Sequence, residues 1–464
     1  MLWVTCRIGK PLDRGNPACD HADHGSAGLV LAARKTLPCG QAESGVATMT
    51  ISFPPPRART RLVALAGLVA LCAACTGPSG PASPAASADS TQAEAVMGVV
   101  DAVRASAHAK AVIVQVTIDG REVVTRAVGE SMAGVPATTD MHFRNGAVAI
   151  SYVATLLLQL VDEKKVSLDD KVSRWLPDLP YADQVTLGQL AQMTSGYVDY
   201  VSTPELTAEQ YAEPFRTFTP EELIAISTKH PLLYPPGTNW NYSHTNYVIL
   251  GLALEKITGQ PVSTSLRDKV LGPLGLTQTT DPGTPAIPEP VLHAYTSERR
   301  PFLGIPPGTP FYEDSTYWNP SWTITRGAIQ STTIQDLNAT AVGIGSGRLL
   351  SPESYQAMIS KDLIGRTTAL PGCATCFPQA AHYTYGLGIV STGNWVMQNP
   401  KFAGQTGAFA YLPSRKVAVA VEVTFEEAAF DPATGDYKNA ADLLARKIGA
   451  VLVPDDAPPI PPGA

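Results

Sequence analysis

Apolar and polar residues follow two different periods along the chain, and each period predicts a different kind of element. Valines at positions 96, 99, 100 and 103 have helical spacing and predict a helix from Glu94 to Ala109. Apolar residues then run from Ala111 to Ile118, and Asp119-Gly120 favours a tight turn into a second strand from Glu122 to Val128. The folded part of the chain is therefore predicted to start with a helix and a hairpin.

Helical spacing dominates the middle of the chain. Three elements are predicted before residue 200: a long apolar helix at Ser151–Val166 and shorter elements at Lys171–Leu179 and Thr186–Ser195. The pattern from Glu222 to Leu276 is helical with loop interruptions, and its apolar stretch Tyr247–Ile257 ends at Gly259, a typical C-cap. The segment Ala286–Trp322, rich in proline and aromatic residues, predicts a long ordered loop.

Strand patterns return in the last third of the chain. A helix is predicted at Thr333–Ile344, strands at Tyr385–Ser391 and Lys416–Thr424, and a closing helix at Tyr437–Val451. Strands thus lie at both ends of the domain and helices in its middle. This order favours one sheet-containing layer built from the two ends, with a helical lobe formed by the middle.

Residues 49–74 have the pattern of an export signal. Arg57, Arg59 and Arg61 precede an apolar run from Leu62 to Leu71, and small residues then lead to a cysteine. The ending resembles a bacterial lipoprotein signal, which implies a lipid on Cys75 and a protein held at the extracytoplasmic face of the cell membrane. Plain secretion and a retained membrane anchor remain open alternatives.

The remaining boundaries follow from composition. Residues 1–48 precede the signal and are interpreted as a spurious extension of the start or as disordered chain. Residues 75–93 are rich in Ser, Pro and Ala and predict a linker, 94–451 the folded domain, and 452–464 a Pro-rich tail.

Charge and cysteine usage argue against several classes of function. The net charge is -7 and cations do not cluster, which argues against a nucleic-acid partner. In an oxidising compartment, Cys373 and Cys376 are most simply a local disulfide. A redox motif fits less well because Pro371-Gly372 indicates a loop, and a zinc site would need a second ligand pair. We expect neither a metal nor a cofactor.

The stretch Phe143–Ser151 and the chain as far as Pro180 resemble the start of the catalytic domain in the serine β-lactamase and D-alanyl-D-alanine carboxypeptidase family, a group of penicillin-binding serine hydrolases. That family has the pattern F-R-x-G-S-x-x-K here. Ala147 stands at the position of the nucleophilic serine and Ile150 at that of the lysine that activates it. The resemblance implies an α/β (α+β) fold, with an antiparallel β-sheet flanked by helices, an all-α lobe and a site between them.

Two further motifs of the family are altered. In the motif that resembles Y-x-N, Tyr242 is kept and His244 stands at the Asn position. In the motif that resembles K-T-G or H-T-G, Thr406 and Gly407 are kept and Gln405 stands at the cation position. The resemblance implies that these residues bind ligand, and that backbone N–H groups at Ala147 and near Ala408 form an oxyanion hole.

These substitutions together predict a non-catalytic envelope lipoprotein, which binds a cell-wall peptide, a lipid or a protein partner through the cleft. One alternative is an esterase, carboxypeptidase or β-lactamase-like hydrolase with a different nucleophile or a water activated by His244. Another is a purely structural or tethering role, with the cleft filled by the protein's own side chains. Ser151 is a poor substitute nucleophile, because one position past the lysine it points about 100° away on a helix. The aromatic residues Tyr312, Tyr317, Trp318 and Trp322 are interpreted either as ligand or partner contacts or as a staple of their loop to the core.

Overall fold

The computed structural model describes residues 84–462. The predictions for residues 1–48 and 49–74, for Cys75 and for the first part of the linker therefore lie outside the described residues. No helix in the described part is long and apolar enough to cross a membrane.

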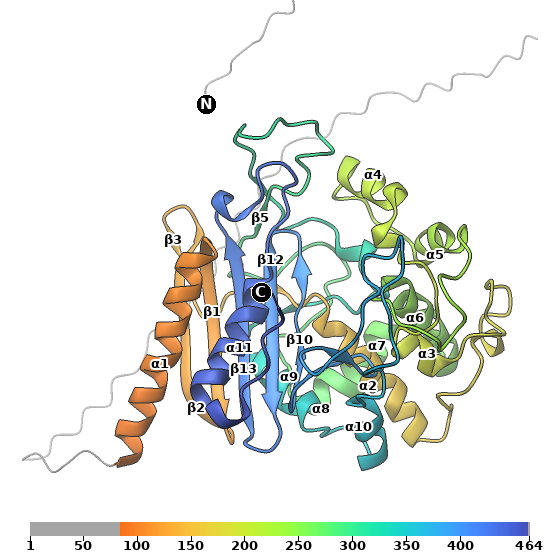
Figure 1. Ribbon diagram of the computed structural model, residues 1–464, viewed down its shortest axis with the longest axis horizontal. Coiled ribbons are helices and arrows are strands. Elements are labelled where there is room, and N and C mark those ends of the chain that lie inside the picture. Colours follow the sequence, from red (N-terminus) through yellow and green to blue (C-terminus); the bar gives the residue numbers. More distant parts are fainter. Residues whose placement is uncertain (1–83, 463–464) are drawn as a thin grey trace, which may run out of the picture. The chain divides into compact units, whose positions relative to one another are not determined.

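A nine-stranded antiparallel sheet forms the centre of the domain (Figure 1). Its strands are β1 (Ala109–Ile118), β2 (Arg121–Met132), β3 (Val135–Pro136), β8 (Thr384–Tyr385), β9 (Val390–Thr392), β10 (Trp395–Gln398), β11 (Lys401–Phe402), β12 (Gln405–Leu412) and β13 (Val417–Phe425). They follow the order β3-β2-β1-β13-β12-β10-β9-β8, and β11 pairs with the start of β12. Strands from the two ends of the domain thus meet where β1 pairs with β13, as the sequence pattern predicts.

Helices cover both faces of this sheet. The helices α1 (Pro84–Ser106) and α11 (Ala440–Leu452) pack against each other and against the sheet on one face, where Figure 1 shows them side by side. On the other face α9 (Ile334–Gly345) packs against β1, β12 and β13, and α2 (Val148–Asp162) packs against α9. The predicted antiparallel sheet with flanking helices is confirmed.

The middle of the chain forms a helical lobe beside the sheet (Figure 1). Its helices are α3 (Leu187–Ala191), α4 (Pro204–Ala212), α5 (Pro220–Thr228), α6 (His244–Thr258), α7 (Val262–Leu266), α8 (Gly272–Leu274) and α10 (Pro352–Met358). Thr219 and Glu222 form a capping box at the start of α5. Gly259 ends α6 with a φ of 72°, as its position in the sequence predicts.

Several boundaries differ from the sequence prediction for local reasons. Helix α1 starts at Pro84 instead of Glu94, inside the residues expected to form a linker, because alanine favours helix and proline is tolerated in a first turn. It ends at Ser106, before His108 adopts a φ of 49°. Helix α2 starts at Val148 instead of Ser151 and ends before Lys164, whose φ is 56°.

The sequence patterns did not predict the pairing of short β-strands. The strand expected at Tyr385–Ser391 is two strands, β8 and β9, which pair with each other. Strand β4 (Phe143–Arg144) pairs with β7 (Ser331–Thr332), and this pairing fixes the chain just before α2. Within the expected loop Ala286–Trp322, the short strands β5 (Tyr295–Thr296) and β6 (Glu313–Asp314) pair with each other, and Val291 forms an isolated bridge with His142.

Candidate functional site

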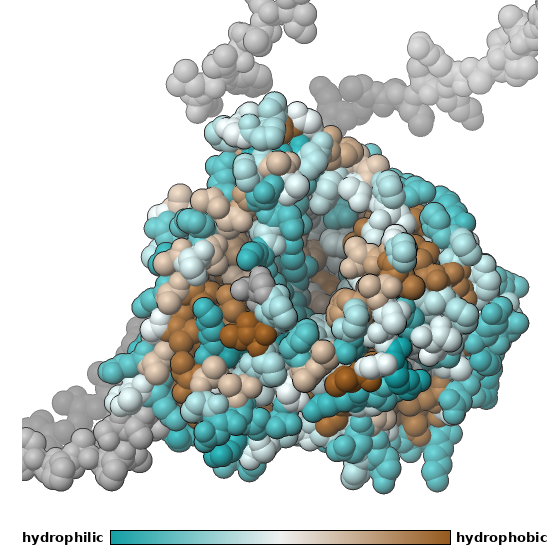
Figure 2. All heavy atoms as spheres, in the orientation of Figure 1, coloured by the Kyte–Doolittle hydropathy of each residue, from teal (hydrophilic) through white to brown (hydrophobic). Residues whose placement is uncertain are grey.

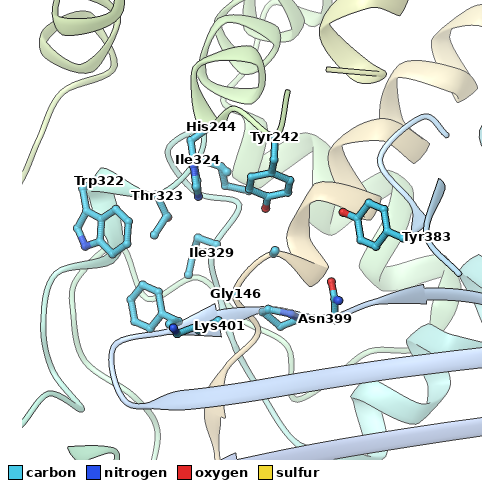
Figure 3. Close-up of a pocket in the computed structure, with 13 residues that line it drawn as sticks. Gly146, Tyr242, His244, Trp322, Thr323, Ile324, Ile329, Tyr383, Asn399 and Lys401 are labelled. Atoms are coloured by element: carbon cyan, nitrogen blue, oxygen red, sulfur yellow. The ribbon is translucent and has the colours of Figure 1, made fainter. Parts of the chain in front are cut away.

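A cavity of about 280 Å³ opens where the sheet meets the helical lobe, and Figure 2 shows the surface hollowed there. Its wall combines the start of α2, the start of α6, the chain after Pro320 and the β10–β11 connection. The lining residues, most of them labelled in Figure 3, are Gly146, Ala147, Tyr242, His244, Trp322, Thr323, Ile324, Ile329, Tyr383, Asn399, Pro400, Lys401 and Phe402.

The start of α2 contributes an apolar side chain to the cavity wall. Ala147 lines the cavity and is the N-cap of α2, where it offers no side-chain oxygen. Ile150 is completely buried and does not reach the cavity. Ser151 is also completely buried, and its hydroxyl donates to the Val148 carbonyl at 2.7 Å. None of these three residues therefore provides a nucleophile.

Two phenol groups converge on the cavity opposite Ala147. In Figure 3 the hydroxyls of Tyr242 and Tyr383 both point into the open space. Neither hydroxyl has a hydrogen-bond partner among residues 84–462, and burial raises the pKa of both phenols well above the ordinary value. Both groups therefore stay neutral and can donate a hydrogen bond to a ligand.

His244 is held by a buried carboxylate. Its Nδ1 lies 3.1 Å from Asp199 Oδ2, and its backbone N–H donates to Asp199 Oδ1 at 3.0 Å. Asp199 is only 5% exposed, so the pair is shielded from water on that side. An acceptor at Nδ1 favours the tautomer whose proton is on Nδ1, which leaves Nε2 free to accept a hydrogen bond from a ligand or water.

The β12 motif lies behind the cavity, contrary to the expectation from sequence. Gln405, Thr406, Gly407 and Ala408 do not line the cavity, and β11 pairs with the first two of them. Thr406 faces α11, where its hydroxyl accepts from the Ala441 N–H. The Gly407 N–H donates to the Pro400 carbonyl at 3.0 Å.

The two expected oxyanion-hole donors lie in different places. Neighbouring N–H groups point to opposite edges of a strand, so the Ala408 N–H points toward β13 and away from the β11 edge at which the cavity opens. Of the two donors that the resemblance implies, only the Ala147 backbone lies in the cavity wall.

Strand β11 brings a different cation to the site. Lys401 is paired with Thr406 across the strands and lines the cavity, whereas Gln405 does not. A two-residue turn makes this possible: Ala403 and Gly404 have φ values of 38° and 84°, the pattern of a type I′ hairpin. Lys401 Nζ bonds to Asp436 and lies 4.3 Å from the centre of the Tyr437 ring.

The β10–β11 connection also contacts the start of α2. A Cβ atom added at Gly146 would lie 2.6 Å from Pro400 Cβ, and one added at Gly407 would lie 3.2 Å from Pro400 Cγ. Next to it, Asn399 Nδ2 donates to Asp442 at 3.0 Å. The Asn399 carboxamide oxygen has no partner among the described residues and is available to a ligand N–H.

The aromatic loop residues divide between the two interpretations. Trp322 lines the cavity and stacks on Phe402 with 5.7 Å between ring centres, and Trp318 lines a neighbouring cavity. Tyr312 instead donates to the Phe425 carbonyl and packs on the Tyr295 ring, which fastens the loop to the sheet. Tyr317 contacts His293 and lines neither cavity.

Cys373 and Cys376 form a disulfide, with their Cα atoms 5.4 Å apart. Both lie outside the cavity wall. In the described residues no group of three or more His, Cys, Asp or Glu is placed to hold a metal ion.

Sequence reasoning missed four residues of the site: Asp199, Tyr383, Asn399 and Lys401. Asp199 lies 45 residues before His244, and no local pattern links the two. Lys401 also had no usable signal, because alanine at Ala403 is not a residue that type I′ turns favour.

The sequence is similar to proteins of a known family. The beta-lactamase family model matches residues 96–443. Penicillin-binding protein 4 of Amycolatopsis lactamdurans is 33% identical over 185 residues, which are 39% of this chain and 46% of that protein. Esterase EstB of Burkholderia gladioli is 32% identical over 155 residues, 31% of this chain and 39% of the esterase. The chain thus spans less than half the length of both relatives.

Solved structures agree at the level of the fold. The D-amino acid amidase from Ochrobactrum anthropi SV3, complexed with L-phenylalanine amide, superposes with a TM-score of 0.63 at 22% identity, over 79% of this chain and 99% of that one. The D-stereospecific amidohydrolase from Streptomyces gives a TM-score of 0.61 at 24% identity, over 77% of this chain and 97% of that one. Because the family model covers most of the sequence, the chain belongs to the beta-lactamase family of serine hydrolases.

Proposed function

We propose that this protein is a non-acylating member of its family that binds the carboxylate end of a cell-wall peptide in the cavity. The observation that carries the proposal is the hydrocarbon at both reactive positions, Ala147 in the cavity wall and Ile150 buried beneath it. Loss of the nucleophile in a serine hydrolase costs on the order of 10⁶ in kcat. On this proposal, hydrolysis through an acyl-enzyme is not expected at a useful rate.

The cavity retains the features of a ligand site although it lacks the nucleophile. Tyr242 and Tyr383 offer O–H donors, Asn399 offers an acceptor and Lys401 a positive charge. Trp322, Phe402, Ile324 and Ile329 supply apolar surface. A few polar groups converging on a largely apolar wall are typical of small-molecule and peptide sites.

The chemistry of these groups favours a short peptide. A terminal carboxylate would meet Lys401, a backbone carbonyl would accept from a phenol, and a backbone N–H would donate to Asn399. The names of two similar proteins, a penicillin-binding protein and a D-amino acid amidase, support a D-amino acid in this peptide. We also propose attachment to the cell membrane through Cys75, and the Cys373–Cys376 disulfide supports an oxidising compartment.

Replacing Lys401 with glutamine is expected to weaken the binding of an N-acyl-D-alanyl-D-alanine peptide about tenfold, since a hydrogen bond to a charged group contributes about 1.5–3 kcal/mol and Asp436 shares this lysine. Isothermal titration calorimetry measures the affinity. Lys416→Gln is the matched control, because Lys416 pairs with Asp119 at the far end of β13. Equal affinities for native protein and Lys401→Gln would contradict the placement of the carboxylate.

A second function is favoured by one observation, the Asp199–His244 pair. A histidine oriented by a buried carboxylate can act as a general base for a water molecule in the cavity. This would give slow hydrolysis of esters or amides without an acyl-enzyme.

Measurement of p-nitrophenyl ester hydrolysis separates the two functions. If His244 activates water, the native protein turns over the ester, and His244→Ala lowers kcat by about 10²–10⁴-fold. A binding protein shows no turnover above the uncatalysed rate. His230→Ala is the matched control and keeps the native rate, because His230 is exposed and does not line the cavity.

A further inference from the structure

The first turn of α11 holds the Asn399 carboxamide at the cavity wall. Asn399 Nδ2 donates to Asp442 Oδ1 at 3.0 Å, and Asn439 Nδ2 donates to the Asn399 backbone carbonyl at 2.8 Å. Asn439 is the N-cap of α11, and its side chain accepts from the Asp442 N–H. The backbone and the side chain of Asn399 are therefore both tied to one helix end.

Asp442 is in turn fixed by a buried cation. Arg446 is completely buried, and its Nε donates to Asp442 Oδ2 at 2.8 Å, so the two carboxylate oxygens have different partners. Nη1 of the same guanidinium donates to the Thr392 hydroxyl at 2.6 Å and to the Pro459 carbonyl. Pro459 lies in the Pro-rich tail, which thus supports this side of the cavity wall.

These contacts decide which end of the carboxamide faces a ligand. A guanidinium group only donates hydrogen bonds, and a carboxylate in an ion pair only accepts them. Asp442 therefore takes the Asn399 NH₂ group, and the carboxamide oxygen is the end left for the cavity. In Figure 3 the Asn399 side chain points toward the side of the cavity where Tyr383 lies. Without Asp442, the carboxamide could turn over and offer either end.

We propose that Asp442 is a positioning residue, which makes the cavity select a ligand N–H over a ligand oxygen at Asn399. The inference rests on the proposed peptide-binding function and specifies it further. Asn399 and Lys401 are two residues apart and both line the cavity, so a carboxylate near Lys401 places the N–H of the last peptide residue near Asn399. An ester oxygen at this place would face the carboxamide oxygen, and neither acceptor would have a donor.

Two probes test this selection. One is N-acetyl-D-alanyl-D-alanine, and the other is the depsipeptide in which an oxygen replaces the N–H of the last residue. Native protein is expected to bind the peptide about tenfold more tightly, because the depsipeptide loses one hydrogen bond and leaves an acceptor unpaired. Isothermal titration calorimetry measures both affinities.

Asp442→Asn is expected to abolish this preference. Arg446 still needs an acceptor, so the new carboxamide turns its oxygen to Arg446 and its NH₂ group to Asn399. Asn399 then offers its own oxygen to α11 and its NH₂ group to the cavity, and the depsipeptide binds at least as tightly as the peptide. Asp101→Asn, at an exposed position of α1, is the matched control and keeps the native preference.

The outcomes separate this inference from the proposed function. If Asp442→Asn weakens both probes equally, Asp442 has only a structural role and the inference is wrong, while the peptide-binding function stands. Equal affinities of native protein for the two probes would overturn the inference as well. If neither probe binds native protein, the peptide-binding function is wrong and the inference falls with it.

A second variant keeps the inference open to test if Asp442→Asn does not fold. Asn399→Ala leaves the ion pair of Arg446 and Asp442 intact and removes the carboxamide from the half-buried position 399. It is expected to bind the two probes equally. A peptide preference that persists in Asn399→Ala would contradict the inference.

Discussion

The double variant Ala147→Ser/Ile150→Lys is expected to form a covalent adduct with a fluorescent penicillin, whereas the native protein forms none. Ala147 already lies in the cavity wall at the start of α2, so a serine there would present its hydroxyl to the ligand. Ile150 lies one helical turn further on and is completely buried, and a lysine there would supply the missing base. Labelled protein on a denaturing gel measures the adduct.

The single variants are the matched controls for this gain. Ala147→Ser provides a hydroxyl without a base, and Ile150→Lys provides an amine without a nucleophile, so neither is expected to be labelled at a comparable rate. The gain in rate can be large, because a missing nucleophile costs on the order of 10⁶ in kcat. A folded double variant that stays unlabelled would contradict this prediction. It would indicate that strand β11, which pairs with the start of β12, also prevents acylation.

Replacing Arg446 with methionine is expected to lower the free energy of unfolding by about 3–5 kcal/mol, the cost of removing one partner of a buried ion pair. Arg446 is completely buried in α11, and its Nε donates to Asp442 at 2.8 Å. Its Nη1 also donates to the Thr392 hydroxyl at 2.6 Å and to the Pro459 carbonyl. Urea denaturation followed by circular dichroism measures the change.

The neighbouring Lys447→Met variant is the control, since it changes the same helix at a partly exposed position and is expected to stay within about 0.5 kcal/mol. Adding Asp442→Leu to Arg446→Met should recover part of the lost stability, because no unpaired buried charge then remains. Full stability of Arg446→Met alone would contradict a stabilising role for the ion pair and hydrogen bonds of Arg446.

The fold could be predicted where a pattern extends over many residues. The apolar run at the core of β13, the hairpin of β1 and β2 and the helix α9 all have enough residues to show a period. Strands of two residues, such as β4 and β11, contain no period and form only because a partner strand passes beside them. The start of α1 was missed because small residues fit a linker and a helix equally well.

Part of the site could be predicted from the sequence, because some of its residues belong to motifs of known register. Ala147, Tyr242 and His244 lie at the ends of helices or beside them, where the motif register fixes their place. Gln405 does not line the cavity, and a strand pattern alone does not show which residues border a cavity, because this depends on the elements that pack on each face of the sheet. Asp199 reaches His244 only through the folding of the helical lobe.

The position of Pro400 has a consequence for how the cavity keeps its width. The proline ring lies between Gly146 at the start of α2 and Gly407 on β12, and neither residue has a side chain that could move aside. A rigid ring between two backbones is an incompressible spacer, so the distance from helix to sheet is fixed before any ligand arrives. The protein alone therefore sets the width of the cavity between the start of α2 and β12.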